Sequence, residues 1–242
     1  MITSPSNPRL KLLRKLATRR GRERLGLFAC EGEDLVEAAL DAGLVPVEAL
    51  VDAERPALLE RLPAAEAVEP SLLAAVSELA HPPRVVGVFR RADLPRLDLD
   101  RAPPVALALW HVGDPGNVGT LVRSADALGP ACVCLSAGCA DPAGPKALRA
   151  SMGALFRVPL GGFDEAPGPR VALVPAGATP LWELELADSV TFVLGAERTG
   201  LPRDVVRRCD GTATIPESPG AKSLNVAAAG AIALYEWRRR QT

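Results

Sequence analysis

Short apolar runs alternate with amphipathic stretches along most of the chain, and this alternation is typical of an α/β protein. The apolar runs predict strands at VEALV (47–51), RVVGVF (84–89), PVALALW (104–110), ACVCL (131–135), RVALVPA (170–176) and SVTFVLG (189–195). The amphipathic stretches predict helices at EGEDLVEAALDAG (31–43), ALLERL (57–62), SLLAAVSELA (71–80), VGTLVRSADALG (118–129), PKALRASMGAL (145–155) and KSLNVAAAGAIALYEWRRR (222–240). PVALALW is apolar throughout, as expected for a strand that is covered on both faces.

The stretch RRADLPRLDLDRAPP (90–104) separates two such α/β units. It is charged and rich in proline, and it has no sustained period, so it predicts a linker. We therefore expect a small unit over residues 1–89 and a larger one over residues 105–242.

Composition narrows the class of protein. The chain has 242 residues, 48% apolar and 24% charged, which excludes a chain disordered throughout. Aromatic residues make up only 4%, which argues against repeated stacking platforms for bases. No apolar stretch predicts a membrane span, and the N-terminal MITSPSNPRLKLLRKL lacks the apolar segment of a secretory signal.

The five cysteines are odd in number and have no histidine beside them, which fits buried thiols in a reducing compartment. Cys132 and Cys134 lie in the apolar run ACVCL, so we interpret them as buried strand residues rather than metal ligands. We expect a cytoplasmic protein that binds no metal.

Charge is distributed unevenly along the chain. Residues 1–24 carry eight basic residues and one acid, Glu23, a balance of +7; the whole chain carries −1, so the remainder carries −8. The basic residues of this arm are Arg9, Lys11, Arg14, Lys15, Arg19, Arg20, Arg22 and Arg24. Such asymmetry is typical of a basic arm that binds an anionic partner, and an equally ordinary explanation is a solvated helix face. An apolar stripe of Leu10, Leu12, Leu13 and Leu16 indicates that the helix also packs on something.

Polar residues and glycines gather at three junctions that follow predicted strands, where ligands bind in open α/β sheets. These junctions are GDPGNVGTLVR (113–123), VLGAERTGLP (193–202) and IPESPGAKSLNVAAAG (215–230). The residues alone leave two interpretations for each of three side chains. Asn117 is either a helix cap or a functional residue, and Arg123 is either a surface residue or a functional one. Glu197 is either an exposed turn residue or a ligand contact. An N-cap role explains Ser223 or Asn225, but not both.

His111 directly precedes the first junction and is a candidate general base, whereas His81 lies in HPPR, a predicted turn. The chain contains no G-x-S-x-G, P-loop or H-E-x-x-H motif. GDPGNVGT also lacks the G-x-G-x-x-G fingerprint, which argues against a nucleotide-dependent oxidoreductase.

In this order, the three junctions resemble the signature motifs of the SpoU/TrmH family of RNA ribose 2′-O-methyltransferases, of the knotted SPOUT class. DPGNVGTLVRSADALG resembles N-x-G-x-x-x-R, and LGAERTGLP resembles G-x-E-x-x-G-L. IPESPGAKSLNVAAAGAIALYE resembles the third motif, and PKALRASMGALFRVPL resembles a family segment between the first two. The resemblance covers about residues 105–240, and SPSNPRLKLLRKL with FACEGEDLVEAAL resembles the substrate-binding domain of the rRNA-directed branch.

The resemblance implies a fold, a cofactor and partners. The fold is a small N-terminal α/β substrate-binding domain and a C-terminal SPOUT domain with a mostly parallel sheet and a deep trefoil knot. The cofactor is S-adenosylmethionine, with contacts at Gly195, Ile215 and Leu224. The partners are RNA, with rRNA expected, and a second copy of the chain, which we expect to pack through helix 222–237.

The resemblance also implies a catalytic set, which is Asn117, Arg123, Glu197, Ser223 and Asn225. A guanidinium keeps its proton up to a pH above about 12, so we expect Arg123 to clamp a phosphate or oxyanion and the other four to orient Arg123 and the ribose. We expect RNA contacts from Arg9, Lys11, Arg14, Lys15, Arg19 and Arg20. His111 matches no catalytic position of the family and is interpreted as a strand-end residue.

The chain departs from the family pattern where Arg198 and Thr199 precede Gly200, and where AAAG follows SLNV in place of a segment that commonly contains serine. Neither departure removes a polar residue of the motifs. The alternative function is a non-catalytic RNA-binding protein that retains the knotted fold, and the intact catalytic set argues against it.

Overall fold

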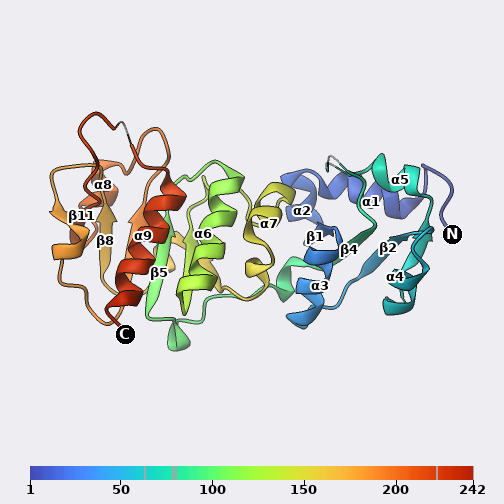
Figure 1. Cartoon of the computed structure of the whole chain (residues 1–242), viewed down its shortest axis with the longest axis horizontal. Helices are drawn as coiled ribbons and strands as arrows, with labels where there is room; N and C mark the ends of the chain where they lie inside the picture. Colours follow the sequence, from blue (N-terminus) through green and yellow to red (C-terminus); the bar gives the residue numbers. More distant parts are fainter. Residues whose placement is uncertain (63, 78, 80, 222, 242) are drawn as a thin grey trace.

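The computed structural model describes residues 1–62, 64–77, 79, 81–221 and 223–241, and Figure 1 shows two α/β units side by side. In the N-terminal unit, the strand order is β1-β4-β2-β3; β4 pairs antiparallel with β1 and β2, and β2 pairs parallel with β3. Its strands are β1 (Leu27–Glu31), β2 (Glu48–Asp52), β3 (Glu66–Val68) and β4 (Val85–Arg90). Its helices are α1 (Pro8–Leu16), α2 (Arg19–Leu25), α3 (Glu33–Asp41), α4 (Pro56–Arg61) and α5 (Pro70–Ala74).

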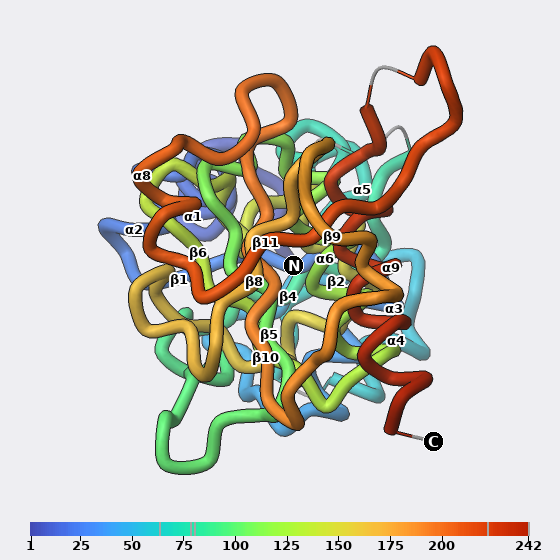
Figure 2. The backbone as a smooth tube through the Cα atoms, turned by 90° about the vertical axis from the view of Figure 1, so that its left-hand side faces the viewer, coloured from blue at the N-terminus to red at the C-terminus, as the bar shows by residue number. Residues whose placement is uncertain are grey.

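The C-terminal unit contains a parallel sheet with the order β7-β6-β5-β10-β8-β11-β9. Its strands are β5 (Val105–Leu109), β6 (Ala131–Leu135), β7 (Leu160–Gly162), β8 (Arg170–Leu173), β9 (Thr179–Pro180), β10 (Val190–Leu194) and β11 (Gly211–Thr214). Its helices are α6 (Pro115–Leu128), α7 (Pro145–Ser151), α8 (Arg203–Val206) and α9 (Val226–Arg239). Figure 2 shows α6 and α9 on one side of this sheet and α8 on the other.

The expected α/β class and the mostly parallel C-terminal sheet are confirmed. Every residue of β5 is buried, as its continuous apolar run predicts for a strand covered on both faces. In α6, Pro115 stands in the first turn, where a missing N–H costs nothing, and Val118, Leu121 and Val122 turn toward the sheet.

Several element boundaries differ from the sequence pattern. The helix expected over 71–80 ends at Ala74, and residues 78 and 80 lie outside the described residues. The helix expected from 222 begins at Val226, because Asn225 caps it, and residue 222 is also outside the described residues. Strands β1, β3, β7, β9 and β11 and helix α8 were not expected; most are too short for a period to be recognised.

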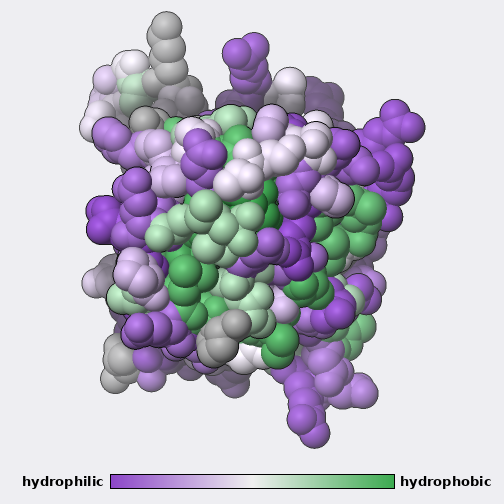
Figure 3. All heavy atoms as spheres, turned by 90° about the vertical axis from the view of Figure 1, so that its right-hand side faces the viewer, coloured by the Kyte–Doolittle hydropathy of each residue, from purple (hydrophilic) through white to green (hydrophobic). Residues whose placement is uncertain are grey.

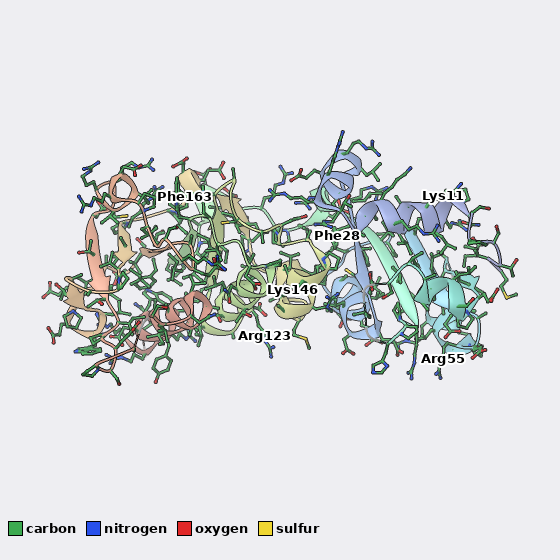
Figure 4. The ribbon with its side chains drawn as sticks, turned by 90° about the horizontal axis from the view of Figure 1, so that it is seen from above. Lys11, Phe28, Arg55, Arg123, Lys146 and Phe163 are labelled. Carbon is green, nitrogen blue, oxygen red and sulfur yellow. The ribbon has the colours of Figure 1, made fainter. Side chains whose placement is uncertain are left out.

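The two units share one apolar core. Phe28 of the N-terminal unit stacks on Phe89 and on Phe156 of the C-terminal unit, with ring centroids 5.8 and 6.2 Å apart. Figure 4 shows Phe28 where the two units meet. At Gly153, a Cβ would lie 2.6 Å from Cβ of Ala38, so the backbones of the units also approach closely. The junction is therefore a packed interior, not a flexible contact.

A buried charge cluster crosses the same junction. Arg22 Nε lies 2.7 Å from Asp141 Oδ2, and Arg91 Nη1 lies 2.9 Å from Asp141 Oδ1. Arg22 is only 5% exposed and Asp141 8%. Arg22 also donates to the carbonyls of Leu16 and Ala17, at 2.8 and 3.0 Å. The cluster ties α2, the segment after β4 and the loop after β6 to one carboxylate.

None of the helices in the described part of the chain combines the length and apolar character needed to cross a membrane.

Candidate active site

Three of the five expected catalytic side chains meet in the structure. Asn117 Nδ2 donates to Glu197 Oε1 at 3.0 Å, and Asn225 Nδ2 donates to Asn117 Oδ1 at 3.1 Å. These residues come from the start of α6, the loop after β10 and the start of α9. Asn117 therefore connects the three sequence junctions through one side-chain amide.

The cap of α6 is Asp114, not Asn117. Asp114 Oδ1 accepts from the backbone N–H of Asn117 at 3.0 Å, which satisfies one of the unpaired N–H groups of the first turn. This frees the Asn117 side chain to reach Glu197 and Asn225. Of the two interpretations that the sequence left for Asn117, the structure excludes the helix cap.

Glu197 is held as an acceptor. Its Oε2 accepts from the N–H of Gly113, and its Oε1 accepts from the N–H of Asp114, both at 3.3 Å. Partial burial by itself raises the pKa of Glu197, but the hydrogen bonds from Asn117 and these backbone groups outweigh it and lower that pKa. The group is ionised at neutral pH, which suits it to orient Asn117 rather than to donate a proton.

Asn225 has two roles. Its Oδ1 accepts from the N–H groups of Ala227 and Ala228, at 2.8 and 3.2 Å, and so caps α9. Its amide nitrogen remains free to donate to Asn117. The first turn of α9 is thus locked to the first turn of α6.

Arg123 and Ser223 stand apart from this cluster. Arg123 is exposed on α6, and Figure 4 shows it at the outer surface. Neither its guanidinium nor the hydroxyl of the exposed Ser223 bonds to another residue in the described part of the chain. Both side chains are therefore available to a substrate or a second protein chain.

Two of the three expected cofactor residues follow the carboxyl ends of parallel strands, and the third precedes α9. Gly195 directly follows β10, Ile215 directly follows β11, and Leu224 lies just before α9. A Cβ on Gly195 would lie 2.2 Å from the carbonyl carbon of Gly200, so only glycine allows this loop to fold back on itself. Ile215 is half-buried and Leu224 is 38% exposed.

Lys146 was not among the expected site residues. It lies on α7, and its Nζ is 2.7 Å from Asp114 Oδ2 at the start of α6. The hydrogen bond from Lys146 lowers the pKa of Asp114 and keeps the capping carboxylate ionised. The segment that carries Lys146 resembles a family segment, but the sequence spacing gives no sign of a contact between Lys146 and Asp114, which are 32 residues apart.

Some basic side chains of the arm have no partner among the described residues, whereas others form hydrogen bonds or ion pairs. The side chains of Lys11, Lys15 and Arg20 are exposed and bond to no described residue. Arg14 donates to the carbonyl of Pro5 at 3.0 Å, and Arg9 forms ion pairs with Glu48 and Glu66.

Two arm arginines reach the C-terminal unit. Arg19 donates to the carbonyl of Cys139 at 2.9 Å, while Arg22 is buried against Asp141. The formal charge of the arm therefore overstates what a ligand can contact.

The cysteines are free thiols, and Cys132 and Cys134 are buried strand residues, as expected. Among the residues that the structure describes, no group of three or more His, Cys, Asp or Glu side chains is placed to hold a metal ion.

Comparisons with known proteins agree along almost the whole chain. The model of the SpoU rRNA Methylase family matches residues 104–235, and that of the MRM3-like substrate binding domain matches residues 7–87. The chain is 33% identical over 248 residues to the 23S rRNA (guanosine(2553)-2′-O)-methyltransferase RlmP of Bacillus subtilis, covering 98% of each protein. It is 32% identical over 253 residues to the 23S rRNA (uridine(2479)-2′-O)-methyltransferase of Streptomyces viridochromogenes, covering 93% of this chain and 87% of that protein. The AdoMet-bound rRNA methyltransferase from Sinorhizobium meliloti superposes with a TM-score of 0.86 at 29% identity, covering 100% of this chain and 98% of that one.

Proposed function

Because the chain belongs to the SpoU rRNA methylase family, we propose that it transfers the methyl group of S-adenosylmethionine to a ribose 2′-hydroxyl of RNA, with rRNA as the substrate. The observation that carries this proposal is the hydrogen-bonded cluster of Asn117, Glu197 and Asn225, assembled from three motifs distant in sequence. The intact cluster disfavours a binding protein that has lost turnover.

The residues that follow β10 and β11 and precede α9 fit S-adenosylmethionine. Gly195 allows the loop after β10 to fold back on itself, while Ile215 and Leu224 offer apolar groups to a purine. Strands β10 and β11 flank β8, so their ends lie about 10 Å apart, a span that an adenosine can bridge. When bound, S-adenosylmethionine supplies a methyl group on a positively charged sulfur.

The protein must then align a ribose hydroxyl with that methyl group. Correct placement of two reacting groups can lower a barrier by roughly 7–11 kcal/mol. Glu197 fixes the Asn117 amide, and Asn225 fixes its carbonyl, so the amide has one orientation. Ser223, two residues before Asn225, adds a hydroxyl that bonds to no described residue. We propose that these groups hold the ribose.

Arg123 is proposed to clamp a substrate phosphate or oxyanion. A guanidinium rarely loses its proton, so Arg123 is a poor general base, but it binds phosphate oxygens well. Its exposed position and lack of a partner among the described residues leave it free for that contact.

The proposal is tested by incubating the purified protein with deproteinised 23S rRNA and methyl-labelled S-adenosylmethionine, and then mapping the ribose methylation. We expect stoichiometric transfer to a 2′-oxygen. Tight RNA binding without transfer would favour the non-catalytic alternative, and transfer to a base nitrogen or carbon would contradict the ribose assignment.

We propose that residues 1–89 form the RNA substrate-binding domain, residues 90–104 a linker and residues 105–242 the methyltransferase domain. Figure 1 supports this, because α1 and α2 lie at the same upper edge as the start of α9. Figure 3 shows that the outer end of the N-terminal unit mixes hydrophilic and hydrophobic residues, so the RNA proposal rests on the arm and not on the whole end. The deep trefoil knot and a cytoplasmic location are part of the same proposal.

Replacing Lys11 and Lys15 with glutamine is expected to weaken RNA binding and to reduce its salt dependence. Each phosphate contact releases counterions, so losing two should lower the slope of log affinity against log salt by about 1.5. The measurement is a filter-binding titration at several salt concentrations. Affinity for S-adenosylmethionine should stay unchanged.

A matched control removes the same charge elsewhere. Arg55 lies on the opposite side of the N-terminal unit from Lys11 (Figure 4), and Arg101 lies between the units along the chain. Glutamine at both positions should leave the salt slope at the wild-type value. An equal reduction of the salt slope in the two double variants would assign the effect to net charge and exclude a specific arm contact.

We propose a homodimer that packs through the C-terminal helix. Ile232 and Tyr235 of α9 are 40% and 59% exposed, although they stand one turn apart on an otherwise well-packed helix. Glutamate at both positions is expected to give a monomer by light scattering at micromolar concentration, because it places charges in an apolar contact. Glutamate at Val45, which is 67% exposed on the N-terminal unit, should leave the dimer intact. A monomeric wild type would overturn this part of the proposal.

A further inference from the structure

His111 occupies a strained position at the end of β5, and this feature is not explained by the proposed ribose site. Its φ of 54° lies in the left-handed region, which costs roughly 1 kcal/mol or more for a residue other than glycine. Glycine would meet the backbone requirement without strain. A histidine in place of glycine at such a position points to a role for its side chain.

The imidazole ring is held between two neighbours. On one face it stacks on Trp110, with centroids 4.7 Å apart and an interplanar angle of 11°. At Gly138, a Cβ would lie 2.6–2.8 Å from three atoms of the ring, so Gly138 approaches the ring closely and a side chain at position 138 would displace it. Trp110 is fixed in turn by an edge contact with Phe163 at 5.0 Å.

The ring edge remains open. His111 is exposed, and in the described part of the chain its ring nitrogens have no hydrogen-bond partner. The backbone N–H of His111 donates to Ser136 Oγ at 2.9 Å, which anchors the strained residue. The result is an exposed ring, stacked on Trp110, whose nitrogens remain available to a ligand.

The ring lies between the proposed ribose site and the basic arm. Two residues beyond His111, the N–H of Gly113 bonds to Glu197. On the other side, Gly138 is followed by Cys139, whose carbonyl accepts from Arg19 of α2. Figure 4 shows Phe163, which packs against Trp110, on the same side of the molecule as Lys11.

We propose that His111 hydrogen-bonds the edge of a nucleobase in the RNA substrate and so helps to select the methylated nucleotide. This inference rests on the proposed function. The ribose site cannot read a base, because every nucleotide carries the same 2′-hydroxyl. A fixed imidazole edge beside that site can distinguish donors from acceptors on a base.

The test combines protein variants with base changes. His111→Phe keeps an aromatic ring on Trp110 and removes both nitrogens, and His111→Gly fits the left-handed backbone and removes the ring. Each is expected to lower kcat/KM about 10-fold on the natural RNA. Each should also abolish discrimination against transcripts that carry single-base changes around the mapped nucleotide.

The control is His81→Phe, since His81 is the other histidine of the chain and is also exposed. It should keep both rate and discrimination. S-adenosylmethionine affinity of both His111 variants should match the wild type, and His111→Phe, which keeps the backbone conformation and the stacked ring, should also keep the melting temperature; this separates base contact from misfolding. Wild-type discrimination in both His111 variants would overturn the inference. If the wild type binds RNA without methylating it, the proposed function fails, and the same base changes are then scored by RNA affinity.

Discussion

Replacing Asn117 with alanine is expected to reduce methyl transfer to rRNA at least 100-fold. The substitution removes the amide that joins Glu197 to Asn225, so three loops lose their common fixed point. A misplacement of about 1 Å at a reacting centre can cost about 100-fold in rate. The measurement is single-turnover transfer of a labelled methyl group at saturating cofactor and RNA.

Cofactor affinity should change less than about threefold in this variant, because none of the three expected cofactor residues bonds to Asn117 and the turn at Gly195 is fixed by the close approach of Gly200. The matched control is Thr120→Ala, which truncates an exposed side chain one turn further along α6 that bonds to no described residue. Its turnover should equal that of the wild type. Near-normal turnover of the Asn117 variant would show that the amide does not orient the ribose.

The sequence predicts the central strands of the fold better than its short strands and the ends of its helices. Apolar runs identify β5, β6 and β10 because strands in the middle of a parallel sheet are buried on both faces. β3 and β9 escape detection because they span only Glu66–Val68 and Thr179–Pro180, too short for any periodicity. For α9, the sequence offers Ser223 or Asn225 as the cap, and the structure selects Asn225, so the helix begins at Val226.

The sequence motifs name the residues of the candidate site but not their geometry. Asn117 bonds to residues 80 and 108 positions away, and no local pattern encodes such a contact. The sequence also treats Asn117 as a possible cap, whereas Asp114 takes that role and frees it. Lys146 was missed for the same reason, because its partner Asp114 is brought close only by the packing of α7 against α6.

The basic arm shows how composition can mislead. Arg22 contributes to the +7 balance of residues 1–24, yet it is buried and neutralised by Asp141. Arg9 is likewise paired with Glu48 and Glu66. The arm therefore serves two functions in our interpretation: exposed lysines for RNA, and a buried arginine that fixes the N-terminal unit against the C-terminal one.

Replacing Asp141 with alanine is expected to destabilise the whole chain by about 3–5 kcal/mol. The substitution leaves the buried Arg22 guanidinium without its counter-charge, which is the costly way to break a buried ion pair. For a protein of this size, the melting temperature should fall by roughly 6–20 °C. Calorimetry and urea unfolding measure the loss, and both units should unfold together because they share a core.

Two controls distinguish buried charge from an ordinary salt bridge. Asp126→Ala breaks the more exposed pair with Arg157, and it should cost less than about 1 kcal/mol. Arg22→Met combined with Asp141→Leu removes both buried charges, and it should recover most of the stability lost in Asp141→Ala. A loss in Asp141→Ala no larger than that in Asp126→Ala would contradict the role of the cluster.

The contribution of Asp141 to the free energy of unfolding should also depend on pH, and it should fall as the pH falls. Burial alone raises the pKa of Asp141, but the hydrogen bond from Arg22 and the positive charges of Arg91 and Arg22 together lower it. A carboxyl whose folded pKa is depressed stabilises the fold above its unfolded pKa of about 4, and it loses that effect as pH falls through the lower folded value. The stability gap between wild type and Asp141→Ala should therefore be full at pH 7 and shrink below about pH 4. A gap that widens on acidification would show that Asp141 is not held ionised by the two arginines.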